Sequence, residues 1–179
     1  MALLHTRPAL ARAHILEAAR HQFEAGDVLH DLIDLAAADV TSGKAHKQRQ
    51  ARERVEQLRS FGVRRFSSLP YAHKPGVAEW LNDWSREFAI GAPDCLWSAT
   101  FYPEESAADY VPALIGAGVE IFKIHVQVGE FHLDDPLLDP VWGVLQDAGT
   151  PVVTHAGSGP VGTPFTGPDS MERLLRRFP

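Results

Sequence analysis

Two histidines and a lysine lie where two predicted strands end. In the segment VEIFKIHV (119–126), polar and apolar residues alternate with a period of two, which predicts a strand carrying Lys123 and His125 on one face. The segment PVVTH (151–155) predicts a second strand that ends in His155. Imidazoles bind metal ions or move protons near neutral pH, and a lysine binds acidic groups. These three residues are therefore the first candidates for a functional site.

The residues between these strands predict a helix that connects them. Apolar residues with helical spacing run through 137–148, at Leu138, Val141, Trp142 and Leu145. Gly149 ends this helix, and Pro151 opens the second strand. A strand, a crossover helix and a strand form a parallel pair with a right-handed connection. Ligands bind beyond the carboxyl ends of such strands, so we expect any chemistry to take place there.

Three segments of this region resemble a known family. FKIHVQVG, DPLLDPVW and PVVTHAGSGP look like the central part of amidohydrolase-related proteins, in the metal-dependent branch that includes the aminocarboxymuconate semialdehyde decarboxylase-like enzymes. The resemblance covers residues 56–179 and is strongest over 61–168. It implies a (β/α)8 barrel with a metal at its mouth, bound by an HxH pair on strand 1, a His on strand 5, a further His on strand 6 and an Asp on strand 8. By strand order His155 matches the strand 5 ligand, and the chain contains no HxH pair.

The resemblance implies a metal-dependent hydrolase of the amidohydrolase superfamily that acts on a small, carboxylate-bearing molecule, with a divalent metal, zinc, as its cofactor. In such sites the metal activates a water or polarises a substrate oxygen, and a nearby His or Asp moves the proton. Two alternatives stay open: a decarboxylase on the same scaffold, and a non-catalytic remnant, because the HxH pair and the later ligands are missing. No catalytic residue is identified, and a chain with fewer than three convergent ligands is expected to be inactive by itself.

Lys123 and His125 are predicted to bind substrate. Lys123 has three interpretations: it binds an acidic substrate group, it pairs with Glu120 or Asp135, or, as in other branches of the superfamily, it is carboxylated and bridges two metals. A buried amine needs a partner in each case, because removing a charge from water costs free energy.

The loop PYAHKPG follows the first predicted barrel strand, VRRFSSL (63–69). It carries Tyr71, His73 and Lys74 on the mouth side, where loop residues of the resembling family often contact substrate. Tyr71 and His73 are therefore further substrate-binding candidates, and ordinary exposed loop residues are the alternative. The loop after His155, AGSGPVGTPFTGP, either offers backbone amides to an anion or is a plain irregular loop.

The order of predicted elements gives an α/β fold, a partial TIM-type (β/α) barrel of about four parallel strands preceded by an N-terminal helical segment. The predicted strands are 63–69, 95–102, 119–126 and 151–155. The predicted helices are 8–25, 27–38, 48–60, 77–89, 105–117, 137–148 and 169–177. A polar hinge is expected over 40–47, with domains 1–47 and 48–179. An open sheet leaves two edges unpaired, which makes a homo-oligomer one option.

Two helices carry specific expectations. The core stripe of the helix over 77–89 is predicted to consist of Trp80, Leu81, Trp84 and Phe88. In the helix over 105–117, Pro112 is an interior residue that favours a kink. Glu104 and Glu105 are placed at the first turn of that helix, where its dipole favours negative charge, and no catalytic role is expected for them.

Composition excludes several classes of protein. A chain of 179 residues suffices for one domain with a substantial core, whereas a full barrel typically needs about 250. The net charge of −6 argues against a nucleic-acid partner. Cys95 is the single cysteine, which excludes an intrachain disulfide and fits a reducing compartment. No apolar run reaches the roughly 18 residues of a membrane span, so we expect a cytoplasmic protein with a small-molecule substrate.

Overall fold

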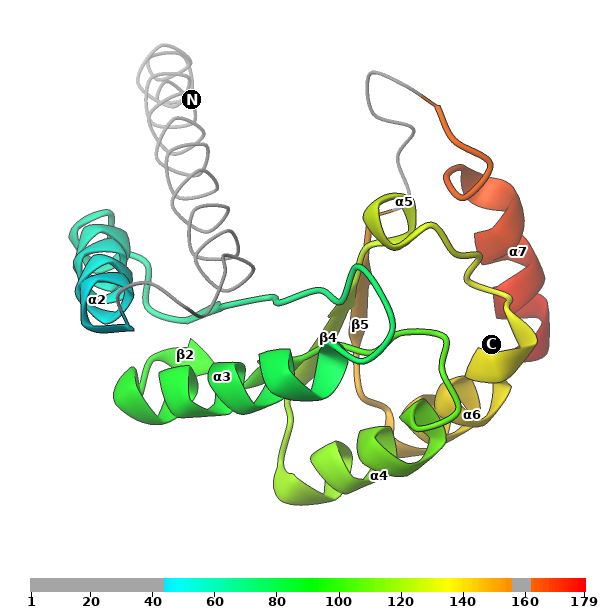
Figure 1. Ribbon diagram of the computed structural model, residues 1–179, viewed down its shortest axis with the longest axis horizontal. Helices are drawn as coiled ribbons and strands as arrows, with labels where there is room; N and C mark the ends of the chain where they lie inside the picture. The colour runs from blue at the N-terminus through cyan, green and yellow to red at the C-terminus, as the bar shows by residue number, and fades with distance from the viewer. Residues whose placement is uncertain (1–43, 156–161) are drawn as a thin grey trace, which may run out of the picture. The chain divides into compact units, whose positions relative to one another are not determined.

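The structure is a computed structural model that describes residues 44–155 and 162–179 (Figure 1). The chain divides into two compact units, Met1–Arg64 and Arg65–Pro179. The predicted site residues all belong to the second unit. No helix among the described residues is long and apolar enough to cross a membrane.

Helix α2 (Lys44–Ser60) is the described helix of the first unit. It begins one turn before the predicted helix over 48–60, so the prediction of a hinge is wrong for Lys44–Lys47. The physical reason is that KAHK contains no helix breaker, and Ala and Lys are good helix formers. Over residues 51–60, the buried side chains of α2 are Ala51, Val55 and Leu58. Beyond its end Gly62 has a φ of +80°, which a side chain would disfavour.

Some predictions for the N-terminal part lie outside the described residues. These are the helices over 8–25 and 27–38 and the hinge residues 40–43. The division into domains 1–47 and 48–179 likewise stays a prediction.

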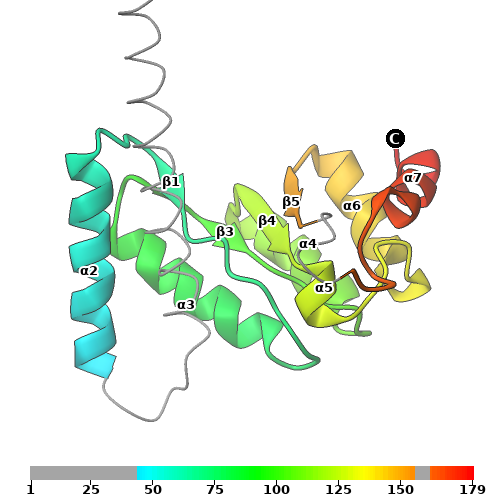
Figure 2. The ribbon, with the colours of Figure 1, turned by 90° about the horizontal axis from the view of Figure 1, so that it is seen from above.

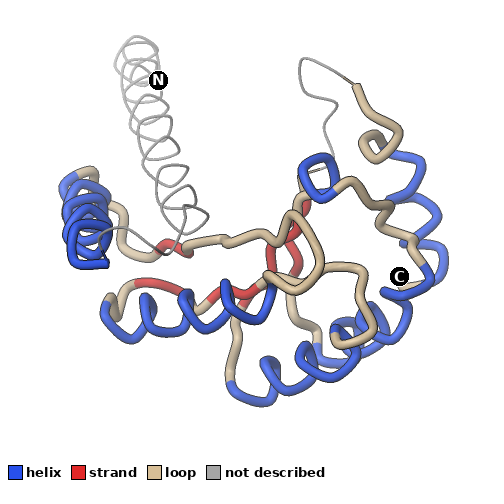
Figure 3. The backbone as a smooth tube through the Cα atoms, viewed as in Figure 1, coloured by secondary structure: helices blue, strands red, loops and turns tan. Residues whose placement is uncertain are grey.

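Short parallel strands form the sheets of the second unit (Figure 2, Figure 3). They are β1 (Phe66–Ser67), β2 (Cys95–Leu96), β3 (Ser98–Ala99), β4 (Ile121–Ile124) and β5 (Val152–Thr154). β1 pairs with β2, and β3, β4 and β5 pair in that order, always in parallel. This arrangement, with helices between the strands, is consistent with the predicted partial barrel.

The strand predicted over 95–102 is wrong in its length and continuity. It breaks at Trp97 into β2 and β3, because the strand pairs with β1 before that residue and with β4 after it. It ends at Ala99, and Asn82, from a neighbouring helix, binds the backbone of the next residue. The Asn82 side chain accepts a hydrogen bond from Thr100 N at 2.7 Å and donates one to Thr100 O at 3.0 Å. These are the groups that a longer strand would have paired.

β4 has the predicted alternation. Phe122 and Ile124 are fully buried, whereas Lys123 between them is half-buried. The strand stops at Ile124, so His125 follows the strand instead of lying within it. β1 is also shorter than the strand predicted over 63–69. The polar residues of interest therefore sit at strand ends and on loops.

Three helices, α3, α4 and α6, follow one another around one side of the strands (Figure 1). The helices of this unit are α3 (Ala78–Gly91), α4 (Ala107–Ala117), α5 (Val126–Gly129), the 3-10 helix η1 (Pro136–Leu138), α6 (Asp139–Ala148) and α7 (Pro168–Arg177). The stripe predicted for 137–148 is confirmed, because its four apolar residues are buried. Gly149 ends α6 with a φ of +63°, as predicted.

α3 buries only part of the predicted stripe: Leu81 lies in the core as predicted, with 2% of its surface exposed. Trp80 is 37% exposed, so its predicted place in the core is wrong. Trp84 and Phe88 stack on one another at 5.3 Å and are half-buried. The buried residues of α3 are Ala78, Leu81, Asn82 and Ser85. The helix is rotated toward its small and polar residues because these make hydrogen bonds with the strands.

A cluster of buried serines joins α3 to the strands. Ser85 Oγ donates a hydrogen bond to Ser98 O at 2.6 Å. Ser68 Oγ lies 2.9 Å from Ser85 Oγ and 3.0 Å from Ser98 Oγ. All three side chains are fully buried, so the hydrogen bonds satisfy hydroxyl groups that water cannot reach.

The core of the second unit contains a cluster of aromatic rings. Phe101 lies 5.8 Å from Phe122 and 5.4 Å from Trp142, the latter in an edge-to-face arrangement. The Trp142 indole N–H donates to Leu133 O at 2.8 Å. The cluster joins β4 to α6 and fixes the crossover helix against the strand that it follows.

Cys95 in β2 is buried, with 7% of its surface exposed. Burial raises the pKa of its thiol to about 12, because a thiolate would lose its hydration there. The thiol is therefore protonated and unreactive in the folded protein near neutral pH.

Candidate functional site

His125 and His155 lie side by side beyond the carboxyl ends of β4 and β5. The strand register pairs Ile124 with Thr154, so the next residue along each strand is one of the two histidines. Their rings stack, with centroids 4.4 Å apart and planes at 13°. A parallel register thus joins two histidines that are distant in the sequence.

Tyr71 reaches the same place from the loop after β1. Its ring centroid lies 5.1 Å from that of His125, with the planes at 50°. Tyr71 and His125 are half-buried, whereas His155 is exposed. The structure therefore brings three predicted site residues, Tyr71, His125 and His155, into one group, the ring cluster.

His73 does not join the ring cluster. It lies on the same loop as Tyr71, but its side chain is exposed and, within the described part of the chain, makes no hydrogen bond or ring contact. Lys74 is exposed as well. Of the three mouth-loop candidates, only Tyr71 is placed beside the strand-end histidines.

The backbone of α5 determines which nitrogen of His125 carries a proton. His125 is the N-cap of α5, and its Nδ1 accepts a hydrogen bond from Val128 N at 3.3 Å. An accepting Nδ1 has no proton, so neutral His125 carries its proton on Nε2. In neutral His125, Nε2 is therefore the hydrogen-bond donor.

Lys123 lies two residues before His125 and pairs in register with Val153 of β5. Its side chain is half-buried. Burial lowers the pKa of its ammonium below the ordinary value of 10.5, because the charged form loses hydration. No hydrogen bond or ion pair compensates this loss among the residues that the structure describes.

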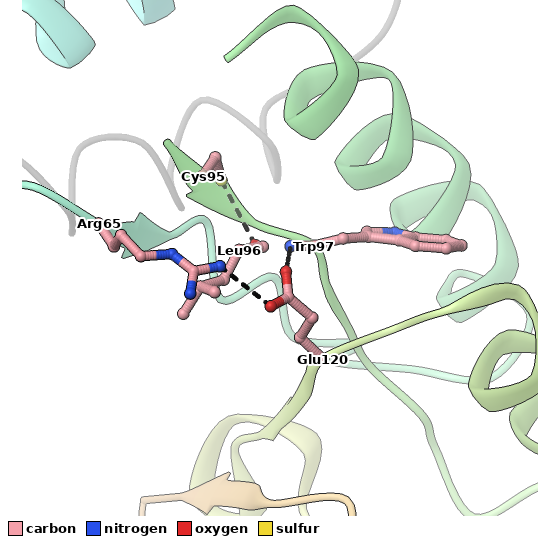
Figure 4. Close-up of polar contacts among 5 residues, drawn as sticks. All are labelled: Arg65, Cys95, Leu96, Trp97 and Glu120. Atoms are coloured by element: carbon pink, nitrogen blue, oxygen red, sulfur yellow. Dashed lines mark hydrogen bonds and ion pairs between the residues drawn. The ribbon is translucent and has the colours of Figure 1, made fainter. Parts of the chain in front are cut away.

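The partners predicted for Lys123 bind elsewhere, so that prediction is wrong. Glu120 Oε2 accepts from Arg65 Nη2 at 3.1 Å, and its Oε1 accepts from Trp97 N at 3.2 Å (Figure 4). Asp135 Oδ1 accepts from a backbone N–H of η1 at 2.9 Å. Both carboxylates satisfy backbone groups that lie closer to them in the fold.

The described residues do not fit the predicted metal centre. An imidazole binds zinc near its ring plane, at about 2.0–2.1 Å from the nitrogen. The stacked planes of His125 and His155 are nearly parallel, so no ion near the rings lies in both, and His125 Nδ1 is already engaged. Among residues 44–155 and 162–179, no three His, Cys, Asp or Glu side chains form a group that could hold a metal. His155 as a single ligand stays a prediction.

Sequence reasoning missed the polar residues that follow β3. α4 begins at Ala107, so Glu104 precedes the helix instead of lying in its first turn. Its carboxylate accepts hydrogen bonds from Gly76 N at 2.8 Å and from Tyr110 Oη at 3.2 Å. The Tyr102 hydroxyl donates to Gly129 O at 2.9 Å. The available signal was position, since Tyr102 and Glu104 follow a strand just as His125 does.

Comparison with known proteins identifies the family. No curated protein and no solved structure matches this chain. A family model described as Amidohydrolase matches residues 41–179. That range contains α2 and all the described strands and helices of the second unit, including the ring cluster and Lys123. The chain belongs to the amidohydrolase family.

Proposed function

We propose that this chain carries the carboxylate-binding part of an amidohydrolase-type hydrolase site. Lys123 and His125 bind the carboxylate of a small substrate, and Tyr71 packs against the rest of the molecule. Membership of the amidohydrolase family supports hydrolase-like chemistry. Lys123 is the observation that supports a carboxylate-bearing substrate, because it is half-buried and lacks an anionic partner among the described residues.

The chemistry of the three side chains supports this assignment. A partly desolvated ammonium gains free energy when an anion approaches it, because the anion replaces lost hydration. His125 donates a second hydrogen bond from Nε2, as its Nδ1 accepts from α5. The Tyr71 ring offers an apolar face beside that donor. A planar carboxylate attached to a ring or chain matches this combination of groups.

We assign the binding of a carboxylate-bearing substrate to the described residues, and we expect its turnover to be inefficient. Amidohydrolases usually bind divalent metal ions, and the described histidines and carboxylates do not converge on one. Catalysis needs about three protein ligands around a metal, and His155 supplies one candidate. We therefore expect the chain to bind carboxylates more readily than it transforms them.

Within the family, we place the chain in the branch of the aminocarboxymuconate semialdehyde decarboxylase-like enzymes. The support is the likeness of the segments FKIHVQVG, DPLLDPVW and PVVTHAGSGP to that branch. Hydrolysis is the proposed reaction. The test is a screen of carboxylate-bearing amides and esters together with unsaturated carboxylic acids. Cleavage products would indicate hydrolysis, and released carbon dioxide would indicate decarboxylation.

Calorimetric titration with benzoate tests the binding assignment. Replacing the ammonium in Lys123→Met should weaken benzoate binding about tenfold or more, since a charge-assisted hydrogen bond is lost. Lys74→Met is the matched control, because Lys74 is exposed on the mouth loop, and it should change affinity less than twofold. Equal affinity of Lys123→Met and the unaltered protein would reject the proposed role of Lys123.

Elemental analysis of the purified chain tests the assignment of weak turnover. We expect clearly less than one zinc or manganese ion per chain after dialysis. A stoichiometric metal that disappears in His155→Ala would show that a complete centre forms, and would move the proposal from binding to full catalysis.

A further inference from the structure

Two hydrogen bonds connect the segment after β3 to the two loops that carry the ring cluster. The Glu104 carboxylate accepts from Gly76 N at 2.8 Å, and Gly76 belongs to the loop of Tyr71. The Tyr102 hydroxyl donates to Gly129 O at 2.9 Å, and Gly129 is the last residue of α5, whose N-cap is His125. One short segment therefore holds the backbones on both sides of the Tyr71–His125 contact.

Tyr110 braces this segment from α4. Its hydroxyl donates to Glu104 Oε1 at 3.2 Å and accepts from Tyr102 N at 3.3 Å. Tyr110 is buried, with 9% of its surface exposed. Burial raises the pKa of both the Tyr102 and the Tyr110 phenols, so both hydroxyls keep their protons near neutral pH. The donors in this network are therefore permanent.

The α5 side of the contact is closely packed. The Phe131 ring meets Tyr102 edge to face, with centroids 5.3 Å apart. A Cβ placed on Gly129 would lie 2.6 Å from the Phe131 ring and 3.4 Å from Tyr102. This close approach lets the carbonyl of Gly129 receive the Tyr102 hydroxyl, and it leaves α5 little freedom to shift.

We infer that Tyr102 and Glu104 are positioning residues, which set the distance between Tyr71 and His125 and thereby the affinity of the site for its carboxylate ligand. The affinity part of this inference rests on the proposed function. The ring-spacing part does not, because the hydrogen bonds and the Tyr71–His125 contact are features of the fold itself. Neither residue belongs to the ring cluster, and both act through the backbones of neighbouring loops.

NMR spectroscopy of protein with 13C-labelled histidine tests the ring spacing. The His125 signal is assigned by its loss in His125→Asn, and Tyr71→Leu defines its position when the neighbouring ring is gone. In Glu104→Ala and in Tyr102→Phe we expect the His125 signal to move toward the Tyr71→Leu position. Glu104→Gln keeps one accepting oxygen, so its His125 signal should lie between the positions in Glu104→Ala and in the unaltered protein. Glu105→Ala, an exposed neighbour, is the matched control and should leave the signal in place.

Benzoate titration of the same variants tests the effect on affinity. We expect Glu104→Ala and Tyr102→Phe to weaken binding about fivefold each, as for the loss of one hydrogen bond. Circular dichroism measures whether each variant is folded. If Glu104→Ala is unfolded, the result for Tyr102→Phe decides the test. An unmoved His125 signal in the folded variants would overturn the inference. If the unaltered protein does not bind benzoate, the proposed function fails while the His125 signal still tests the ring spacing.

Discussion

Lys123 couples the stability of the protein to its proposed role. Because burial lowers the pKa of Lys123, the unfolded chain binds its proton more tightly than the folded chain does. The free energy of unfolding therefore rises with pH between the lowered pKa and the ordinary value of 10.5. Below that window the folded protein bears the full cost of the buried charge.

Lys123→Met should consequently stabilise the folded protein at pH 7 while weakening carboxylate binding. We expect the free energy of unfolding to rise by at most about 1 kcal/mol, because Lys123 is only half-buried and solvent screens part of the cost. The gain should shrink as the pH approaches and passes 10.5, since the lysine then becomes neutral in both states. Urea denaturation at pH 7 and at high pH measures both effects. A variant that is less stable at pH 7 would indicate that the ammonium has a stabilising partner.

Glu120 makes polar contacts for which we expect a structural role. It receives hydrogen bonds from Arg65 and from the backbone of Trp97, where β2 gives way to β3 (Figure 4). The side chains of Arg65 and Glu120 are 64% and 45% exposed, so solvent screens the ion pair.

We expect Glu120→Gln to lower the free energy of unfolding by no more than about 1 kcal/mol. Benzoate affinity should be unchanged, because the pair lies at the amino ends of β1 and β4 and the ring cluster lies beyond the carboxyl ends of β4 and β5. A double-mutant cycle with Arg65→Gln measures the coupling between the two side chains. A large loss of affinity would contradict the structural role.

At the scale of elements, α3 is attached to the strands by a polar side chain as well as by apolar contacts such as that between Phe66 and Phe88. Asn82 is 3% exposed and occupies both backbone groups of Thr100. Asn82→Ala would leave an N–H and a carbonyl without their partners in a buried place. We expect a loss of about 2–3 kcal/mol in the free energy of unfolding, measured with urea. Asp83→Ala, on the exposed side of α3, should change it by less than about 0.5 kcal/mol.

Local patterns predicted some elements well. The alternation in β4 and the stripe of α6 depend on which face of one element is apolar, and the structure buries those residues. Gly149 ends α6 as expected, because its positive φ favours glycine. These features follow from neighbouring residues alone.

Other elements depended on contacts that no local pattern contains. The segment 95–102 reads as one strand, but it changes partner at Trp97, and Asn82 binds the backbone at Thr100. Trp80 falls on an aromatic stripe, yet the helix turns its polar residues inward because the strands offer them hydrogen bonds. In both cases, contacts with distant parts of the chain outweighed the local preference of the segment.

The candidate site was also predictable only in part. His125 and His155 come together because parallel strands end at one edge, which the topology implies. Two other features of the site are visible only in the three-dimensional structure. Lys123 has no counter-charge among the described residues, and the Glu104 carboxylate binds the loop of Tyr71. Long-range hydrogen bonds leave no signature in spacing, so sequence reasoning assigned Glu104 to a helix start.

At the scale of the whole molecule, we expect the outer edge of β5 to act as a surface for self-association. Among the described strands, only β4 pairs with β5. Val153 is 37% exposed, and β5 borders a cavity of about 350 Å³ with mainly apolar lining from α6 and α7. Two copies related by a two-fold axis would pair their β5 edges.

We therefore expect a concentration-dependent dimer in sedimentation velocity experiments. Val153→Lys places a charge on the edge and should weaken association about tenfold or more. Ile90→Lys is the control, because Ile90 is 74% exposed on α3, away from this edge. A single monomeric species at every concentration would exclude the β5 interface.

The rate at which Cys95 is alkylated can report local opening of the folded protein. Cys95 is the single thiol of the chain, it lies in β2, and its proton is retained up to a pKa of about 12. Because Cys95 is buried, an alkylating reagent can reach it only when the structure around β2 opens, so the labelled fraction reports such openings without any added probe. We expect iodoacetamide to react about 100-fold more slowly than with an unfolded thiol, followed by mass spectrometry. Repeated at increasing urea concentrations and compared with global unfolding, the same labelling would show whether the surroundings of Cys95 open before the rest of the protein unfolds.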